Sequence, residues 1–422
     1  YEILAGDWSS DVCSSDLAAR MQLAGEEEGA FDRWYRSQPA FADDPHALLA
    51  DGAVYPQRGQ FGRYVAQRFA EEARASGGRL THLREQALSV NHGEVVTDGG
   101  RRLQADLLVL AISHPPPSLP SLATPFATHP ALIANPWRAG VLATIAPEAS
   151  VAVMGTGLTM ADTVATLTRL GHRGPIAAFS RRGLLSRSNL SGSSEPWPGE
   201  YDRGTLRQRL RQIRLDIERA AEQGQAWQVV LDAVRNQGQS IWQGLTVADR
   251  QRFLRHLRSY WDVHRYRIAP QVAGVLEQRQ RDGSLRVLAA RLTALEGDAQ
   301  KLALTLAPRR GETLRVSADH FILTTGPAHG GLTDSQPLLR QLSQRGLIRA
   351  DAFGLGLDVD PRSRAIGREG RITPNLLVSG PAARAYFGEL MGLPQVADHA
   401  AAVADEALRT LGVKQSARCP AF

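Results

Sequence analysis

The chain has 422 residues, of which 43% are hydrophobic, and a formal net charge of +6. This length predicts two or three domains with substantial cores, and no run of about 18 apolar residues is present, which excludes a membrane-spanning helix. There are only two cysteines, Cys13 and Cys419, near opposite ends of the chain and in poor sequence contexts, so neither a disulfide framework nor a metal cluster is predicted, which indicates a reducing, cytoplasmic setting.

The excess positive charge is carried by arginine and is concentrated between Glu200 and Pro270. These arginines alternate with acids at helical spacing, as in the run from Arg214 to Arg219. Such mixing is typical of a solvated helix face rather than of a phosphate-binding track. We therefore expect no nucleic-acid partner and no membrane partner.

Residues 1–17 have neither helical nor strand periodicity and lack the basic region of a signal peptide. We expect them to be a foreign or disordered segment that packs on nothing. After Ala18, the aromatic residues Phe31, Trp34 and Tyr35 recur at helical spacing, and residues 60–75 predict a second helix.

Three strands are predicted next, at residues 80–90, 93–97 and 102–112. The segments Asn91-His92-Gly93 and Asp98-Gly99-Gly100 between them are strong hairpin turns. The last strand begins near Asp106 and runs into Ser113-His114. These features indicate a β-meander that leads into a buried strand.

The most informative stretch runs from residue 150 to residue 183. Val151–Met154 predicts a buried parallel strand, and Gly155 and Gly157 allow a sharp turn before a helix at 158–170. The N–H groups at the start of such a helix suit a pyrophosphate. We therefore assign the turn as a dinucleotide site formed by Gly155, Thr156, Gly157, Leu158 and Thr159, although Met160 replaces the third glycine of the usual fingerprint.

A second strand at 176–179 ends in Ser180-Arg181-Arg182, about where a Rossmann unit meets the ribose 2′ position. Arginines there suit the 2′-phosphate of NADPH. The alternative is an ordinary βαβ unit with a glycine turn and solvated arginines. Residues 199–257 predict a helical insertion that ends in the cluster Trp261–Arg267, in which His264 is either a backbone-bonded or a catalytic residue.

The meander pattern recurs at 286–307 and leads into a strand that begins at Asp319 and ends at Thr325-Gly326. A further strand at 375–379 ends in Gly380-Pro381, and a helix follows from Gln395 to Leu411. A strand–turn unit on each side of the 150–183 stretch indicates one nucleotide domain inserted in another. We expect an α/β fold of two nested Rossmann-like domains, with β-meanders and a helical insertion.

Together these segments resemble the FAD/NAD(P)-binding protein family that includes FAD-dependent urate hydroxylase-like proteins, related more loosely to the flavin monooxygenases. The matching segments are Ala18-Ala-Arg-Met21, Phe61-Gly-Arg-Tyr64, Asn135-Pro-Trp137, Gly155-Thr-Gly-Leu-Thr-Met160, Gly171-His-Arg-Gly-Pro-Ile176, Ser180-Arg-Arg-Gly-Leu184, Trp261-Asp-Val-His-Arg265 and the Gly380-Pro381 loop.

The resemblance implies an FAD domain at 18–135 and 318–422, whose first βαβ unit is missing, and an NAD(P) domain at 136–317. It also implies that Gly380, Pro381, Arg384, Glu389 and Gln395 lie against the flavin, with Arg58 near the FAD. Apart from the resemblance, the small residues Thr325 and Gly326 predict a turn at which the backbone approaches a nucleotide. Two departures are the absent N-terminal glycine-rich turn and Ser113, which stands where the family has glycine. We expect the chain as written to hold FAD poorly.

The reaction expected from the resemblance is FAD- and NADPH-dependent hydroxylation of a small organic molecule with O2, in which the flavin supplies the chemistry and the protein positions the reactants. The alternatives are an NAD(P)H-flavin reductase or dehydrogenase that oxygenates nothing, and a nucleotide-binding module without turnover. No nucleophile, triad or metal site is predicted, and neither the substrate nor the oligomeric state follows from the sequence.

Overall fold

The structure is a computed structural model that describes residue 23 and residues 29–112, 114–115, 117–190, 194–326, 329–392 and 395–413. The expectations for residues 1–17, the segment 18–21 and Ser113 therefore lie outside the described residues. No helix of the described part is long and apolar enough to cross a membrane.

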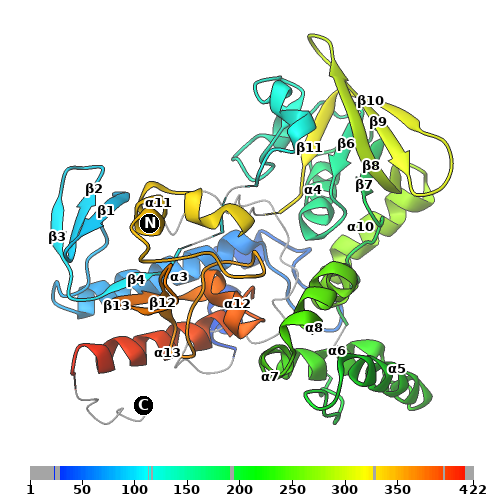
Figure 1. Cartoon of the computed structure of the whole chain (residues 1–422). Coiled ribbons are helices and arrows are strands. Elements are labelled where there is room, and N and C mark those ends of the chain that lie inside the picture. Colours follow the sequence, from blue (N-terminus) through cyan, green and yellow to red (C-terminus); the bar gives the residue numbers. More distant parts are fainter. Residues whose placement is uncertain are drawn as a thin grey trace.

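The largest unit is a seven-stranded sheet in the order β10-β9-β8-β7-β6-β11-β5. Its strands are β5 (Leu132–Ile133), β6 (Val151–Met154), β7 (Ile176–Ser180), β8 (Leu285–Gly297), β9 (Leu302–Pro308), β10 (Leu314–Ala318) and β11 (His320–Leu323). The pairs from β8 through β5 are parallel, whereas β9 and β10 form an antiparallel edge. Figure 1 shows this sheet at the upper right with α4 (Leu158–Arg169) and α10 (Pro270–Arg281).

Alternate residues of β6 explain how this sheet is buried on both faces. Val151 and Val153 belong to one apolar cluster together with Met160 of α4, and Ala152 belongs to another cluster together with Phe321. All five side chains are at most 2% exposed. Strands buried on both faces read as continuous apolar runs, so the expectation for Val151–Met154 is confirmed.

The remaining strands form two small sheets at the left of Figure 1. One has the order β1-β2-β3 and the other the order β12-β13-β4. They comprise β1 (Ala87–Asn91), β2 (Glu94–Thr97), β3 (Arg102–Gln104), β4 (Leu108–Leu110), β12 (Arg364–Ile366) and β13 (Ile372–Val378). His92 and Gly93 both have positive φ in the β1–β2 hairpin, as its predicted turn requires.

Helices cover these sheets and fill the space between them (Figure 1). They are α1 (Ala30–Arg36), α2 (Pro39–Ala42), α3 (Arg58–Ala75), α5 (Leu206–Glu222), α6 (Trp227–Asn236), α7 (Gly238–Gln243), α8 (Val247–Arg252), α9 (Arg258–Arg265), α11 (Pro337–Gln344), α12 (Arg384–Phe387) and α13 (Gln395–Thr410). A π-helical turn, Phe253–Leu257, joins α8 to α9. The predicted helical insertion is thus present as α5 to α8, and the aromatic residues of α1 pack in a core with α3.

Two expectations need correction. The expected strand 102–112 is divided, because β3 pairs with β2 whereas β4 pairs with β13. Of the expected strand 80–90, only β1 forms. The strand after Asp319, β11, pairs with β6 on one side and β5 on the other. The seven-stranded sheet therefore takes in residues from both segments that we expected to form the FAD domain.

Asp319 explains why β11 takes this place. Its carboxylate accepts hydrogen bonds from the N–H and the hydroxyl of Ser150 at 2.8 and 2.7 Å, and it lies 2.8 Å from the ammonium of Lys301. These contacts hold the pKa of Asp319 well below its usual range. The start of β11 is thereby fixed beside the start of β6.

Candidate functional site

The turn between β6 and α4 has the backbone that the sequence predicts for a nucleotide-binding turn. Gly155 has a φ of 120°, and a Cβ there would lie 2.6 Å from the carbonyl oxygen of Thr324. Gly157 caps α4 with a φ of −90°, and a Cβ there would meet no atom within 4 Å. The first glycine is thus required by the fold, whereas the second leaves space in front of the helix N-terminus.

Met160 shows what replaces the third glycine of the fingerprint. That glycine normally allows close packing of the helix on the strand. Met160 is fully buried in the core between α4 and the sheet. The departure from the fingerprint therefore changes core packing and not the turn itself.

Thr156 and Ser180 hold the ends of β6 and β7 together. The two hydroxyl oxygens are 2.8 Å apart, and Thr156 also bonds to the carbonyl of Leu184 at 2.6 Å. Beyond Ser180, the side chains of Arg181 and Arg182 are exposed, and the guanidinium of Arg182 lies 5.0 Å from the ring centre of Tyr260. Both arginines are thus placed at the carboxyl end of β7, beside the turn.

A cavity of about 590 Å³ lies next to this turn and joins segments far apart in sequence. Of the predicted site residues, it is lined by Gly157, Leu158, Thr159, Thr325, Gly326, Arg384 and Glu389. Thr325 and Gly326 follow β11, so they face the same cavity as the β6 turn. The remaining lining comes mainly from α5, α6, α7, the π-helical turn and α9.

The other predicted site residues lie outside the lining of this cavity: Gly155, Thr156, Ser180, Arg181, Arg182, Arg58, Gly380, Pro381 and Gln395. Gly380 has a φ of 76°, and its N–H donates to Nδ1 of His399 at 3.0 Å. The buried Oε1 atom of Gln395, at the start of α13, has no hydrogen-bond partner among the described residues. Arg58 is the first residue of α3 rather than a residue before it.

Charged side chains gather at the end of the cavity formed by α9 and α12. Arg265 lies 2.8 Å from Glu389 with both side chains at least 90% buried, and Arg258 lies 3.4 Å from Asp262. Burial raises the pKa of Asp262 against the opposing effect of Arg258 and Arg384.

Arg384 is the buried cation of this group without a carboxylate partner among the described residues. Its side chain is 5% exposed, one Nη donates to the sulfur of Met391 at 2.8 Å, and its Nε has no partner. Burial lowers its pKa. A buried donor without a hydrogen-bond partner is a candidate ligand-binding group.

His264 follows one of its two expected alternatives, whereas Asp162 is a residue that the sequence analysis did not single out. His264 lines the cavity, but its Nδ1 donates to the carbonyl of Tyr260 at 2.8 Å, which is the backbone-bonded alternative. Asp162 was not predicted as a functional residue. It is 2% exposed on α4, 3.9 Å from Nη2 of Arg58, and burial raises its pKa to about 7. The only sequence signal for it is a carboxylate on a helix face that is otherwise apolar.

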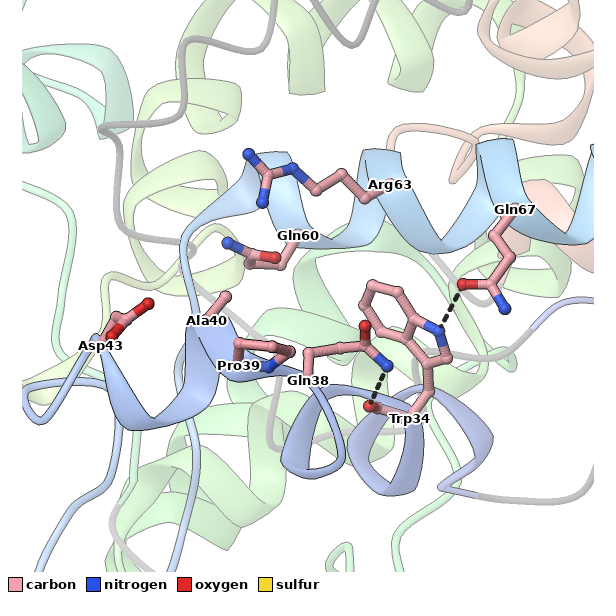
Figure 2. Close-up of a pocket in the computed structure, with 8 residues that line it drawn as sticks. All are labelled: Trp34, Gln38, Pro39, Ala40, Asp43, Gln60, Arg63 and Gln67. Atoms are coloured by element: carbon pink, nitrogen blue, oxygen red, sulfur yellow. Dashed lines mark hydrogen bonds between the residues drawn. The ribbon is translucent and has the colours of Figure 1, made fainter.

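A smaller cavity, of about 380 Å³, lies between α3 and the α1–α2 segment (Figure 2). Figure 2 shows Trp34 donating to Gln67, a bond of 2.9 Å, and Gln38 donating to the carbonyl of Trp34. None of the predicted site residues lines this cavity. The larger cavity is therefore the candidate site.

Comparison with known proteins agrees with this arrangement. Residues 16–115 match the model of an FAD-NAD(P)-binding family. No protein with a curated description matches the chain in sequence.

Several solved structures have a similar fold. L-lysine 6-monooxygenase from Pseudomonas syringae is 16% identical, with a TM-score of 0.62 over 97% of this chain and 88% of that one. Reduced ornithine hydroxylase from Pseudomonas aeruginosa is 16% identical, with a TM-score of 0.61 over 96% and 89%. Ornithine N-hydroxylase from Kutzneria sp. 744 is 13% identical, with a TM-score of 0.59 over 99% and 91%. Residues 16–115 thus match an FAD-NAD(P)-binding family model, and the chain as a whole has the fold shared by these hydroxylases.

Proposed function

We propose that the chain is an FAD- and NADPH-dependent oxidoreductase that hydroxylates a small organic molecule with O2. The observation that carries this proposal is the larger cavity. Its lining contains residues of the dinucleotide turn, the end of β11, the segment at and after α12, and the helical insertion. Ligand sites of α/β folds lie at the carboxyl ends of parallel strands. The hydroxylases of similar fold act on lysine and ornithine, and one structure contains reduced FAD and NADP+.

The residues present fit the two cofactors. The open space at Gly157 and the first turn of α4 suit a pyrophosphate, and the exposed Arg181 and Arg182 suit a 2′-phosphate. The unpartnered Nε of Arg384 and Oε1 of Gln395 are a donor and an acceptor that would be satisfied by a flavin. We therefore assign Gly380, Pro381, Arg384, Glu389 and Gln395 to FAD, with Arg58 near it.

When bound, FAD would supply the redox chemistry that links NADPH to O2. The chain's own contribution is to hold the reactants together and to exclude water. The apolar residues of α5 and the π-helical turn line one side of the cavity and keep solvent away. Arg384 presents a positive charge to the cavity, and burial raises the pKa of Asp262, which lines it as well.

The test is an absorption spectrum of the purified chain after incubation with FAD, followed by NADPH oxidation with and without candidate substrates. Flavin binding, NADPH-dependent reduction and a hydroxylated product are expected. Peroxide as the sole product would instead favour a flavin reductase, and bound cofactor without NADPH consumption would favour a non-catalytic module.

A further inference from the structure

One wall of the larger cavity is almost entirely aliphatic. Leu206, Leu210, Ile213 and Ile217 of α5 line the cavity, and their spacing places them on one face of the helix. Leu254 and Leu257 of the π-helical turn line it as well. We call these six residues the apolar wall. None of them is fully buried by the protein itself, so they present hydrocarbon to the cavity.

The polar groups beside the apolar wall are already used by the protein. The guanidinium of Arg209 donates to the backbone carbonyls of Asp202, Gly204 and Ile241 at 2.6 to 3.0 Å. The hydroxyl of Tyr201 donates to Asp216 at 3.0 Å. Buried polar groups that already make these hydrogen bonds have few free donor or acceptor positions for a ligand.

The two carboxylates that line the cavity lie beside arginines: Oδ2 of Asp262 is 3.4 Å from Arg258, and Oε1 of Glu389 is 2.8 Å from Nη2 of Arg265, although neither atom of this second pair makes a hydrogen bond. A ligand's ammonium group would have to compete with one of these arginines for its carboxylate. The charges of the cavity therefore disfavour a cationic amine.

We propose that the substrate is a neutral, hydrocarbon-rich small molecule whose apolar part lies on the apolar wall, and not a charged amine or amino acid. Its role as the substrate depends on the proposed function, whereas the chemical class of the ligand depends only on the cavity. Transfer of hydrocarbon from water to such a wall is favourable in proportion to its area. Affinity should accordingly rise about three- to four-fold for each added methylene.

Binding can be measured without cofactor or turnover. The neutral dye N-phenyl-1-naphthylamine is added to the purified chain, and its fluorescence is followed as competitors displace it. We expect 1-hexanol, 1-octanol and 1-decanol to displace the dye with midpoints that fall about ten-fold or more per two methylenes. Octylamine should be weaker than octanol, and millimolar lysine or ornithine should have no effect. No dye binding, or displacement by lysine or ornithine, would overturn the proposal.

A matched pair of variants on α5 locates the site. Ile213→Asn puts an amide into the apolar wall, whereas Leu215→Asn changes a residue of the same helix that is 37% exposed and does not line the cavity. Dye affinity should fall at least ten-fold in Ile213→Asn and stay unchanged in Leu215→Asn, with thermal melts as the folding check. If Ile213→Asn does not fold, Ile213→Ala should give a smaller loss in the same direction. Equal affinity in all folded variants would refute the assignment.

The two proposals fail separately. Dye and alcohol binding in a chain that never oxidises NADPH would reject the hydroxylase but keep the ligand class. NADPH-dependent hydroxylation of lysine or ornithine would support the hydroxylase and reject the proposed class of ligand.

Discussion

The guanidinium of Arg265 and the carboxylate of Glu389 are 2.8 Å apart, with side chains 4% and 10% exposed. This ion pair joins α9 to the segment after α12. Removing one partner of a buried pair leaves the other charged and desolvated, which costs about 3–5 kcal/mol. Glu389→Gln should lower the free energy of unfolding, measured in urea without cofactor, by about that amount.

The pair Arg173–Glu148 provides the control, because its atoms are 2.9 Å apart while both side chains are more than two-thirds exposed. Glu148→Gln should cost less than about 1 kcal/mol. Equal costs for the two substitutions would show that the Arg265–Glu389 pair adds nothing to stability.

The two glycines of the dinucleotide turn should respond differently to alanine. Gly155→Ala places a methyl group against the backbone of Thr324 at a φ of 120°, so the protein should lose stability. Gly157→Ala meets open space at an ordinary φ, so its thermal melt should match that of the wild type. The new methyl nevertheless lies where a phosphate would approach, and NADPH binding by Gly157→Ala should weaken at least ten-fold. Unchanged NADPH binding by this variant would remove the turn from the site.

Arg181 and Arg182 are predicted to select NADPH over NADH. Each lost charge-assisted contact to a phosphate costs about 1.5–3 kcal/mol. The double variant Arg181→Ala/Arg182→Ala should therefore raise the KM for NADPH at least ten-fold and leave the KM for NADH unchanged. Arg173→Ala, which removes an exposed arginine elsewhere, should change neither. Equal losses for both cofactors would refute the assignment.

Asp162 should make stability fall as pH rises. Burial raises its pKa to about 7 in the folded chain, against 3.8 for the unassisted group, so the folded state binds more protons between these values. Its contribution is complete below about pH 4 and is lost as the pH rises through 7. Asp162→Asn should melt above the wild type at pH 8 and close to it at pH 5. A difference in melting temperature that does not depend on pH would contradict this account.

His399 should make the stability of the folded chain fall as the pH falls. Its Nδ1 accepts from the N–H of Gly380, its Nε2 bonds to Ser363 at 2.9 Å, and burial lowers its pKa to about 4. The unfolded chain therefore binds the proton first, and stability is lost as the pH falls from 6.5 towards 4. The advantage of wild type over His399→Asn in thermal melts should shrink across that range. An advantage that stays constant across that range would contradict this account.

The parts of the fold that the sequence predicted are local. The β6 strand, its turn and α4 follow from an apolar run, two glycines and a helical period within some twenty residues. The hairpin at His92-Gly93 follows from its turn residues alone. In each case, neighbours in sequence determine the backbone.

The missed features depend on partners far apart in sequence. No local signal distinguishes β11 from β4, since both follow a meander and an aspartate, and only the contacts of Asp319 with Ser150 and Lys301 separate them. The cavity likewise needs Trp242 of α7 bonded to the carbonyl of Ala385 at 2.9 Å, across 143 positions. Burial of Asp162 and His399 depends on such packing too, so neither could be identified as a titrating group.

The pairing of β5 with β11 has a consequence for protein engineering. The chain enters the seven-stranded sheet at Leu132 of β5 and leaves it at Leu323 of β11, and Leu132 and Phe321 are partners in register on these adjacent parallel strands. Adjacent strands are about 4.8 Å apart. Because the two strands are parallel, a fragment of residues 130–326 would begin at one end of this strand pair and end beyond the other, so that its transplantation into another protein would need connecting peptides that span the length of these strands.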